Sequence, residues 1–350
     1  MRLEPLAQRL WYGPARRSWW LWPPEALYRI VIAVRRFAYS SGLLRTVRVE
    51  APVIVVGNLT VGGTGKTPVV SWLARQLATH GLKVGIVLRG YRGSHAGRAL
   101  RVRADTDATL AGDEAVMHAA GGADIVFVAH DRVAAARAAA EAGAQVVLSD
   151  DGLQHLRLAR DCEVVVIDRA RGFGNGHCLP AGPLREPAAR IDRADAVVLV
   201  DRAPRGRDAD PAMVAPSPIK CRVEFELGPA VNLATGERRP LAAFAGERVR
   251  AVAGVGHPEA FFAALERAGL RVERCPLPDH ATVGELGRAL AGGATVLMTE
   301  KDAVKCRGLA DARGWFVTLG LAFAVGDDQR LLDKVLERIR QPRQPGVARG

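Results

Sequence analysis

A glycine-rich segment follows the first strongly apolar run of the chain and ends in Gly65-Lys66-Thr67. Glycines let backbone N–H groups approach phosphate oxygens, and the start of a following helix adds positive charge. A lysine at this position can reach the β- and γ-phosphates of a nucleotide, and the threonine hydroxyl can ligate Mg²⁺. The spacing predicts a P-loop formed by Thr60, Val61, Gly62, Gly63, Thr64, Gly65, Lys66 and Thr67.

One position departs from the usual P-loop pattern, because Thr60 stands where that pattern has glycine. The context still favours a phosphate site, since an apolar strand precedes the loop and a helix with Pro68 in its first turn follows it. Lysine is also scarce, with six among 49 Lys and Arg residues. A lysine inside a glycine-rich loop is therefore more informative here than in a lysine-rich chain. The alternative is a glycine-rich turn that binds no ligand.

Two adjacent carboxylates, Asp150 and Asp151, follow the apolar run Val146–Leu148. Ligands of open α/β sheets bind beyond the carboxyl ends of the strands, and an acid there can hold Mg²⁺ directly or through water. A plain turn, in which Asp and Gly are favoured locally, is the alternative.

The order of the predicted elements indicates an α/β protein. Short β-branched runs alternate with helical segments from residue 51 onward, which predicts a mostly parallel, P-loop NTPase-type sheet flanked by helices. We expect a kinase-type core over residues 51–205, then a smaller α/β domain over 206–325 after a linker at 201–218. A closing helix and a disordered tail are expected within 326–350. The expected strands are Val53–Val56, Val84–Leu88, Ile125–Val128, Val146–Leu148, Val164–Ile167, Val197–Val200, Val249–Val255 and Thr295–Met298, and the expected helices are Pro68–His80, Arg132–Ala142, Pro258–Ala268 and Leu331–Ile339.

The first 50 residues carry nine arginines against three glutamates, which is half of the net charge of +12. They also hold eight of the 19 aromatic residues. A helix after Pro23-Pro24 has an apolar stripe, and arginine and tryptophan beside such a stripe suit a membrane interface. Residues 1–50 therefore predict an amphipathic membrane-associating segment, with an ordinary helix packed on its own domain as the alternative.

The five cysteines are scattered and form no CxxC pair, which argues against a disulfide scaffold or zinc site. A basic protein can bind nucleic acid, phosphorylated ligands or anionic membranes. Because the charge gathers beside tryptophan and an apolar stripe, and no nucleic-acid-binding module is recognised, we expect no nucleic-acid partner.

Taken together, the motifs resemble the tetraacyldisaccharide 4'-kinase family, the lipid A 4'-kinases of Gram-negative bacteria. The residues that carry this resemblance are, in chain order, 57–68 (GNLTVGGTGKTP), 88–93 (LRGYRG), 112–114 (GDE), 130–132 (HDR), 149–155 (SDDGLQH), 174–187 (GNGHCLPAGPLREP), 278–280 (PDH) and 299–305 (TEKDAVK). The resemblance spans nearly the whole chain, and Thr60 itself matches this family.

The resemblance implies transfer of the γ-phosphoryl group of ATP, with Mg²⁺, to the 4'-hydroxyl of tetraacyldisaccharide 1-phosphate, which gives lipid IVA in lipid A biosynthesis. It also implies two domains and peripheral attachment to the cytoplasmic face of the inner membrane through the N-terminal helix. We expect the protein to act there as a monomer.

The resemblance also implies roles for single residues. Asp113 matches an acid that activates the sugar hydroxyl, and His280 matches its histidine partner. The two lie in different predicted domains, so on this division they meet only if the linker closes. Residues near Mg²⁺ and the phosphates would be Thr67, Asp150, Asp151, Gln154 and Glu186, and the residues facing substrate or phosphate would be Arg132, Arg185 and His155.

One rival function shares the loop and the amphipathic helix. A membrane-recruited P-loop ATPase switch would hydrolyse ATP to change partners. Phosphate that appears on an added lipid acceptor would distinguish a kinase from such a switch.

Overall fold

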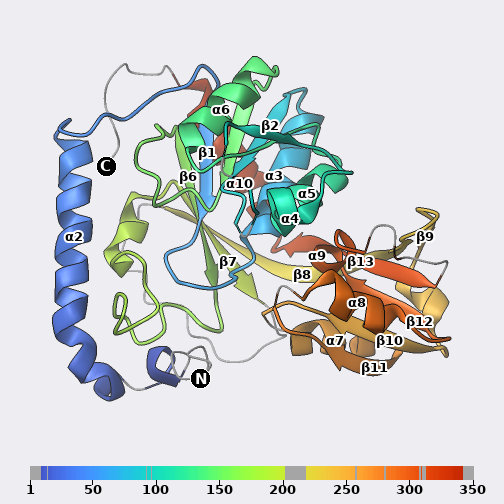
Figure 1. The fold of residues 1–350 in the computed structure, drawn as a ribbon. Coiled ribbons are helices and arrows are strands. Elements are labelled where there is room, and N and C mark those ends of the chain that lie inside the picture. The colour runs from blue at the N-terminus through green and yellow to red at the C-terminus, as the bar shows by residue number, and fades with distance from the viewer. Residues whose placement is uncertain are drawn as a thin grey trace. The chain divides into compact units, whose positions relative to one another are not determined.

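The computed structural model describes residues 9–13, 15–91, 93–95, 97–201, 218–256, 258–279, 281–306, 309 and 313–341. The chain forms two compact units (Figure 1). Unit 1 comprises Met1–Arg89, Asp131–Glu224 and Phe323–Gly350, and unit 2 comprises Gly90–His130 and Phe225–Ala322. Most of the expected linker, His280 and the expected tail beyond residue 341 lie outside the described residues.

Unit 1 is built on a parallel sheet in which β1 lies between β5 and β6. Beyond them β2 pairs with β5, and β7 pairs with β6 and with the first residues of β8. These strands are β1 (Val53–Gly57), β2 (Val84–Leu88), β5 (Val146–Asp150), β6 (Cys162–Asp168), β7 (Ala196–Asp201) and β8 (Ile219–Asn232). Every pairing among them is parallel, as the alternating sequence pattern predicts.

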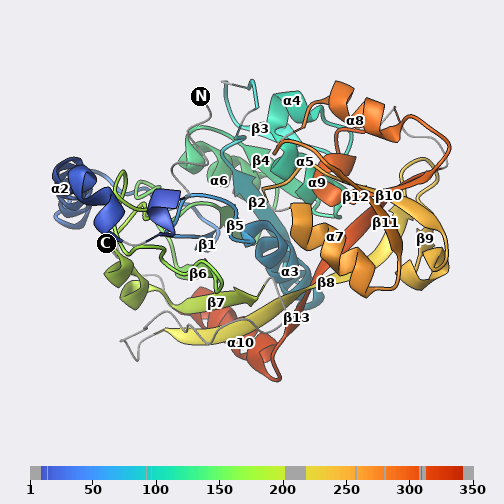
Figure 2. The same cartoon turned by 90° about the horizontal axis from the view of Figure 1, so that it is seen from below.

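Helices cover both faces of this sheet. Helix α6 (Arg132–Glu141) packs on β2 and β5, whereas α3 (Lys66–Thr79) and α10 (Asp327–Arg340) contact each other on the other face (Figures 1 and 2). All five residues of β1 are buried, because a strand covered on both faces needs an apolar run without alternation. The phosphate-loop segment therefore starts from a rigid strand in the middle of the core.

Four strands of unit 2 pair in parallel, with β10 between β11 and β12, and with β12 beside β13. Its core contains Phe244, Phe262, Leu265 and Trp315. The strands are β3 (Leu100–Val102), β4 (Ile125–Val128), β9 (Arg238–Arg239), β10 (Arg248–Ala253), β11 (Arg271–Pro276), β12 (Thr295–Thr299) and β13 (Gly314–Phe323), and the helices are α4 (Ala108–Ala111), α5 (Asp113–Ala120), η3 (Leu241–Phe244), α7 (Pro258–Arg267), α8 (Val283–Leu290) and α9 (Glu300–Ala303).

The contacts group residues Gly90–His130 with unit 2, whereas the sequence pattern placed them in the core domain at 51–205. Helix α5 packs on α9, which lies almost 200 positions later in the chain. The sequence pattern also gave no strand at β8, β11 or β13. Charged residues interrupt the apolar ones in β8 and β11. The sequence of β13 is mostly apolar, and this strand was missed despite it.

The N-terminal part of unit 1 consists of η1 (Ala15–Leu21) and the long helix α2 (Trp22–Ser40), which begins with Pro23 and Pro24 in its first turn. Helix α2 runs beside the loop between β6 and β7, which includes the short helix η2 (Ala188–Arg193) (Figures 1 and 2). Within the part of the chain that the structure describes, no helix has the length and apolar character needed to cross a bilayer.

Candidate active site

The phosphate loop joins β1 to α3 and depends on glycine at three points. Gly62 and Gly65 have φ angles of 106° and 89°, which a side chain would strain. A Cβ atom on Gly57 would lie 2.6 Å from Cγ of Leu153, so only glycine lets that leucine pack beneath the loop. Gly62 and Gly63 are exposed at the surface of the loop.

Asn58 holds the loop from within and is completely buried. Its side-chain amide donates to the carbonyl oxygens of Thr60 and Gly62 at 2.8 and 3.2 Å. Its Oδ1 accepts a hydrogen bond from Nζ of Lys66 at 3.0 Å. One amide therefore fixes the loop backbone and the direction of the lysine together.

A buried polar atom in the loop fits a phosphate ligand. The hydroxyl of Thr64 is buried and has no hydrogen-bond partner among the described residues. An unsatisfied buried hydroxyl is unfavourable, and a phosphate oxygen would satisfy it. The loop residues thus fit the nucleotide phosphates that their sequence predicts.

The segment before η2 supports the loop from the side. The N–H of Val61 donates to the carbonyl of Pro183 at 2.8 Å, and the N–H of Arg185 donates to the carbonyl of Leu59 at 2.6 Å. These backbone hydrogen bonds place the side chains of Arg185 and Glu186 beside the phosphate loop.

Asp151 lies between two cations. The strand pairing sets Val56 of β1 opposite Asp150, so the turn after β5 emerges next to the phosphate loop. In that turn Asp151 has a φ of 52°, a left-handed conformation that is uncommon outside glycine. Its carboxylate accepts hydrogen bonds from Arg185 at 3.0 and 3.1 Å and lies 3.5 Å from Nζ of Lys66.

These cations outweigh the effect of burial on Asp151. Burial raises the pKa of this carboxyl, but Lys66 and then Arg185 lower it, and the net pKa lies below the ordinary value. Asp151 is therefore an anion at neutral pH. It therefore offsets the charge of the two cations.

Asp150 differs from its neighbour in environment. It is the last residue of β5 and only 2% exposed, and its carbonyl accepts a hydrogen bond from the buried Arg132 at 3.3 Å. Arg132 begins helix α6, whose start is capped by the side chain of Asp131 through the N–H of Val133. Arg132 therefore lies behind the strand end, in contact with its backbone.

Gln154 and Glu186 form the next part of the site. The Gln154 amide donates to Oε1 of Glu186 at 3.0 Å and to the carbonyl of Asn58 at 3.4 Å. Arg185 reaches Oε1 of Gln154 at 3.5 Å. Gln154 therefore connects both arms of the site, the acidic turn after β5 and the segment before η2.

His155 follows directly and is held neutral. Burial and, after it, the nearby Arg132 lower the pKa of its imidazole to about 4, because both disfavour a positive charge on the ring. Its Nδ1 is buried without a hydrogen-bond partner among the described residues. A neutral imidazole here can accept or donate one hydrogen bond toward a ligand.

The donor set fits a magnesium ion that arrives with a nucleotide. Mg²⁺ in such sites binds one or two carboxylates together with substrate phosphates and waters. No cluster of three or more His, Cys, Asp or Glu side chains that could hold a metal ion occurs in the described part of the chain. Thr67, Asp151 and Glu186 supply hard oxygen donors, which is sufficient for a cation whose other ligands come from phosphate and water.

Asp113 belongs to unit 2, where it begins α5. Gly112 precedes it with a φ of 87°, and a Cβ atom there would lie 2.7 Å from the Tyr91 carbonyl oxygen. The Asp113 carboxylate pairs with Nζ of Lys305 at 2.8 Å, and both side chains are about nine-tenths buried. Lys305 also donates to the carbonyl of Ala281 at 3.1 Å, so it joins the start of α5 to the segment that follows Asp279.

Comparison with known proteins identifies the family. The family model described as tetraacyldisaccharide-1-P 4'-kinase (LpxK) matches residues 17–340. The chain belongs to this family. Curated tetraacyldisaccharide 4'-kinases from Alkalilimnicola ehrlichii and Pseudomonas aeruginosa are 49% and 44% identical to it, over 87% and 92% of this chain and 88% and 95% of theirs. A crystal structure of LpxK from Aquifex aeolicus, described as an "apo" form in complex with ATP, matches with a TM-score of 0.77 at 28% identity, covering 92% of this chain and 99% of that one.

The structure brings most of the expected residues of this LpxK-family protein into one unit. Unit 1 holds the phosphate loop and Arg132, Asp150, Asp151, Gln154, His155, Arg185 and Glu186. Asp113 lies in unit 2, and the expected partner His280 lies outside the described residues. The expected roles of these residues remain predictions.

Two residues with contacts in these regions were not singled out from the sequence. Asn58 and Lys305 both stand inside motifs that carry the family resemblance, at 57–68 and 299–305. Neither side chain has a type that indicates catalysis by itself. Their hydrogen bonds show their positions: Asn58 accepts from Lys66, and Lys305 donates to the carbonyl of Ala281.

Replacement of Asn58 by Ala should weaken ATP binding by about 10-fold or more, because two carbonyls of the loop and an ammonium group lose their partner. Isothermal titration calorimetry measures this. Asn232→Ala is the matched control, because that buried asparagine accepts hydrogen bonds from the N–H groups of Ala234 and Thr235 in a turn of unit 2. Equal ATP affinity in both variants would contradict the role of Asn58.

His155 should make the protein less stable in mild acid. Between about pH 6.5 and about pH 4 the unfolded chain binds a proton at His155 that the folded chain does not, so the free energy of unfolding falls with decreasing pH. Below about pH 4 both states are protonated and the loss is complete.

Urea unfolding at about pH 7 and about pH 5 tests this. The His155→Asn variant should lose less stability between these pH values than the unmodified protein. His80→Asn, which alters an exposed histidine after α3, should behave like the unmodified protein. An unchanged pH dependence in His155→Asn would show that the folded state does protonate this residue.

Proposed function

We propose that this protein transfers the γ-phosphoryl group of ATP to the 4'-hydroxyl of tetraacyldisaccharide 1-phosphate, in lipid A biosynthesis. The family membership supports the reaction, since its curated relatives are named tetraacyldisaccharide 4'-kinase. The observation that carries the proposal for this chain is the placement of Lys66. Its ammonium is held by Asn58 and Asp151 at the edge of an open glycine-rich loop.

The cations of unit 1 act on the phosphates. Phosphoryl transfer depends chiefly on positioning and on neutralising charge on the transferred group. Lys66 and Arg185 already converge on one carboxylate, so the same two cations can turn to phosphate oxygens when ATP binds. Thr67, Asp151 and Glu186 would hold Mg²⁺, which supplies further charge neutralisation when bound.

Asp113 is proposed to accept the proton of the sugar hydroxyl. A hydroxyl is a poor nucleophile at neutral pH, and a nearby carboxylate that accepts its proton accelerates attack. Lys305 pairs with this carboxylate and is itself held in place by a hydrogen bond to the carbonyl of Ala281. His280 is proposed as a further partner of this acid, through a hydrogen bond that orients it.

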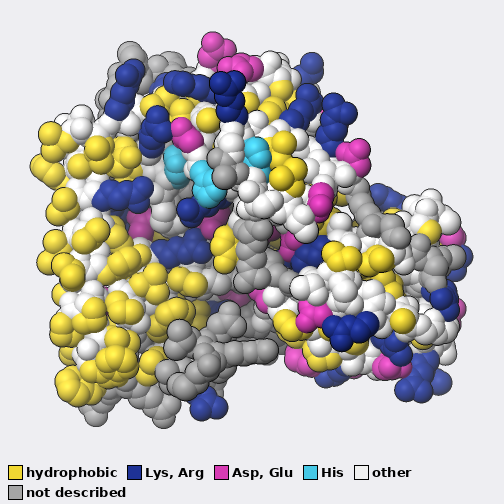
Figure 3. Space-filling model, viewed as in Figure 1, with side chains coloured by type: hydrophobic (Ala, Val, Ile, Leu, Met, Phe, Trp, Pro, Cys, Tyr) yellow, Lys and Arg dark blue, Asp and Glu magenta, His cyan; other side chains and the backbone are white. Residues whose placement is uncertain are grey.

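The membrane is proposed as the place of reaction. The outward side of α2 exposes large apolar side chains, which form the yellow band along this helix in Figure 3. They are Trp19 and Trp20 of η1 with Trp22, Leu27, Ile30, Val31, Val34 and Phe37 of α2. A surface of this kind suits the interface of a bilayer, where the acyl chains of the acceptor can stay. We propose peripheral attachment to the cytoplasmic face of the inner membrane, as a monomer.

The rival function, a membrane-recruited ATPase switch, is not favoured, since the family match covers residues 17–340 and names a kinase. A switch would hydrolyse ATP without a lipid acceptor. The kinase proposal requires the acceptor to receive the labelled phosphate.

Replacement of Lys66 by Ala should reduce phosphoryl transfer by about 100-fold or more, because one preorganised charge at the transferred group is lost. The assay follows γ-labelled ATP with purified disaccharide 1-phosphate lipid in detergent, and detects label on the lipid. Lys83→Ala is the matched control, because this exposed lysine precedes β2. Label released only as inorganic phosphate by the unmodified protein would overturn the kinase proposal.

Replacement of Asp113 by Ala should lower kcat by about 10²- to 10⁴-fold while the ATP dissociation constant changes little, because a general base acts only on the acceptor. Steady-state kinetics and calorimetry separate the two. Asp107→Ala is the control, because this nearby acid only caps α4 through the N–H of Thr109. A loss of ATP affinity as large as the loss of kcat would remove Asp113 from the base role.

A further inference from the structure

Helix α2 has a second, inward side that is polar and tightly held. Glu25 is only 4% exposed, although it lies on a helix whose outward residues Leu27 and Phe37 are 63% and 65% exposed. A buried carboxylate on a surface helix needs partners, because burying an unpaired charge is unfavourable. The inward side of α2 therefore serves something other than contact with lipid.

The first anchor of this side is Glu25 itself. Its carboxylate accepts a hydrogen bond from the N–H of Cys178 at 2.9 Å and contacts Nδ1 of His177 at 2.7 Å. The ring of His177 stacks on Trp22, with 5.6 Å between the ring centroids. Helix α2 is thus fixed to the start of the loop segment 177–186, whose last two residues, Arg185 and Glu186, belong to the candidate site.

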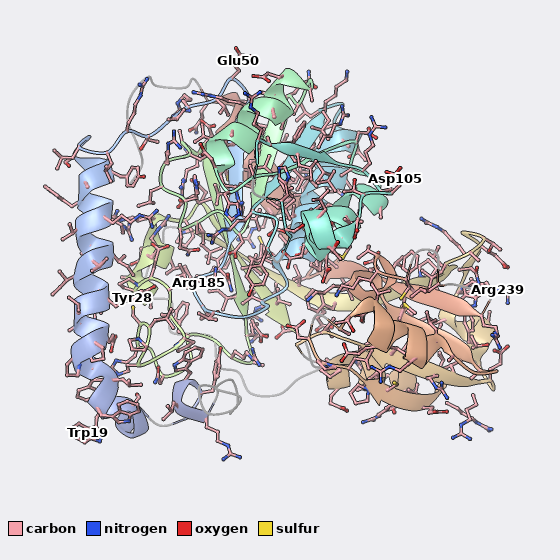
Figure 4. The ribbon with its side chains drawn as sticks, viewed as in Figure 1. Trp19, Tyr28, Glu50, Asp105, Arg185 and Arg239 are labelled. Atoms are coloured by element: carbon pink, nitrogen blue, oxygen red, sulfur yellow. The ribbon has the colours of Figure 1, made fainter. Side chains whose placement is uncertain are left out.

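The second and third anchors lie further along the helix and reach those two residues directly. The hydroxyl of Tyr28 donates to the carbonyl of Arg185 at 3.1 Å (Figure 4, where both are labelled). The guanidinium of Arg36 donates to Oε2 of Glu186 at 3.4 Å. The spacing of Glu25, Tyr28 and Arg36 places all three on one side of a helix.

The two residues held by α2 contact the rest of the candidate site through their side chains. Arg185 binds Asp151 through its side chain, and Glu186 accepts a hydrogen bond from Gln154. Asp151 in turn lies beside Lys66. An uninterrupted series of hydrogen bonds and ion pairs therefore runs from the surface helix to the lysine of the phosphate loop.

The position of Glu186 depends on cations around it. Its side chain is 5% exposed and lies between Arg36 at 3.4 Å and Arg190 at 3.5 Å. Burial and the neighbouring Arg190 lower the pKa of Arg36, and Glu186 opposes both effects. Without Arg36 the carboxylate would lose its contact with α2 and would keep those with Arg190 and Gln154.

We propose that α2 is a positioning element of the reaction, in which Arg36 orients the carboxylate of Glu186 and Tyr28 fixes the backbone of Arg185. The inference rests on the proposed function for the roles of Glu186 and Arg185. It separates two tasks of one helix, since the outward side meets the membrane and the inward side sets the geometry of the phosphate site.

Neighbouring arginines of α2 provide the test. Arg36→Met and Arg35→Met each remove one positive charge from the same turn of the helix. Arg35 is exposed, and its guanidinium lies 6.0 Å from the ring centre of Tyr39, on α2 itself. If α2 acts only through contact with lipid, Arg35→Met should lower kcat at least as much as Arg36→Met does.

Three measurements separate the tasks. Sedimentation with vesicles of phosphatidylglycerol and phosphatidylcholine reports membrane binding, which Arg35→Met should weaken by at most about fivefold and Arg36→Met by no more than Arg35→Met does. Calorimetry reports how much Mg²⁺ strengthens ATP binding, and this strengthening should fall in Arg36→Met and stay unchanged in Arg35→Met. With a detergent-dispersed acceptor, kcat should fall by about 10-fold or more in Arg36→Met alone.

Tyr28→Phe provides a milder variant, because it removes one hydroxyl and keeps the ring. It should lower kcat without altering vesicle binding, and circular dichroism checks that all three helix variants remain folded. Equal effects of Arg35→Met and Arg36→Met on kcat and on the magnesium effect would overturn the inference. If the unmodified protein binds ATP with Mg²⁺ but phosphorylates no lipid, the proposed function fails while the calorimetric comparison still decides the role of Arg36.

Discussion

The balance of charge around Asp151 is the constraint on which the site depends. Lys66 and Arg185 both contact the carboxylate of Asp151, and without this carboxylate their like charges would repel each other. The price of this arrangement is a left-handed backbone at a residue other than glycine. The pairing of β1 with β5 sets the phosphate loop beside the turn of Asp151, so on the proposed function these charges are in place before a phosphate binds.

Two separate supports hold that arrangement. The strands position Lys66 and Asp151 through backbone pairing at the centre of a buried sheet. Arg185 and Glu186 belong to no regular strand or helix, and such a segment is usually more mobile than the sheet. Its backbone is tied to the phosphate loop at Leu59 and Val61, and α2 holds it from the other side. A surface helix can therefore contribute to the geometry of a site that it does not enter.

The sequence predicted the parts of this site that depend on neighbours in the chain. The phosphate loop, its lysine and the acidic turn after β5 were expected, because each follows from a strand and a few residues after it. The contact of Arg36 with Glu186 joins positions 150 residues apart, and no local pattern indicates such a pair. The role of Asn58 was not predicted for a different reason. Its buried amide donates to backbone carbonyl oxygens, and a sequence does not show where these oxygens point.

The prediction for α2 also shows that a sequence pattern does not reveal contacts with distant parts of the chain. Its apolar stripe follows from helical spacing, and the two alternatives were a membrane surface and packing on the protein's own domain. The structure shows that the side chains of α2 divide between solvent and protein, because Leu27 and Phe37 are exposed while Glu25 is buried against the loop. Spacing along a helix predicts which residues share a side. What that side meets depends on distant segments, here on a loop whose conformation is set by the phosphate loop itself.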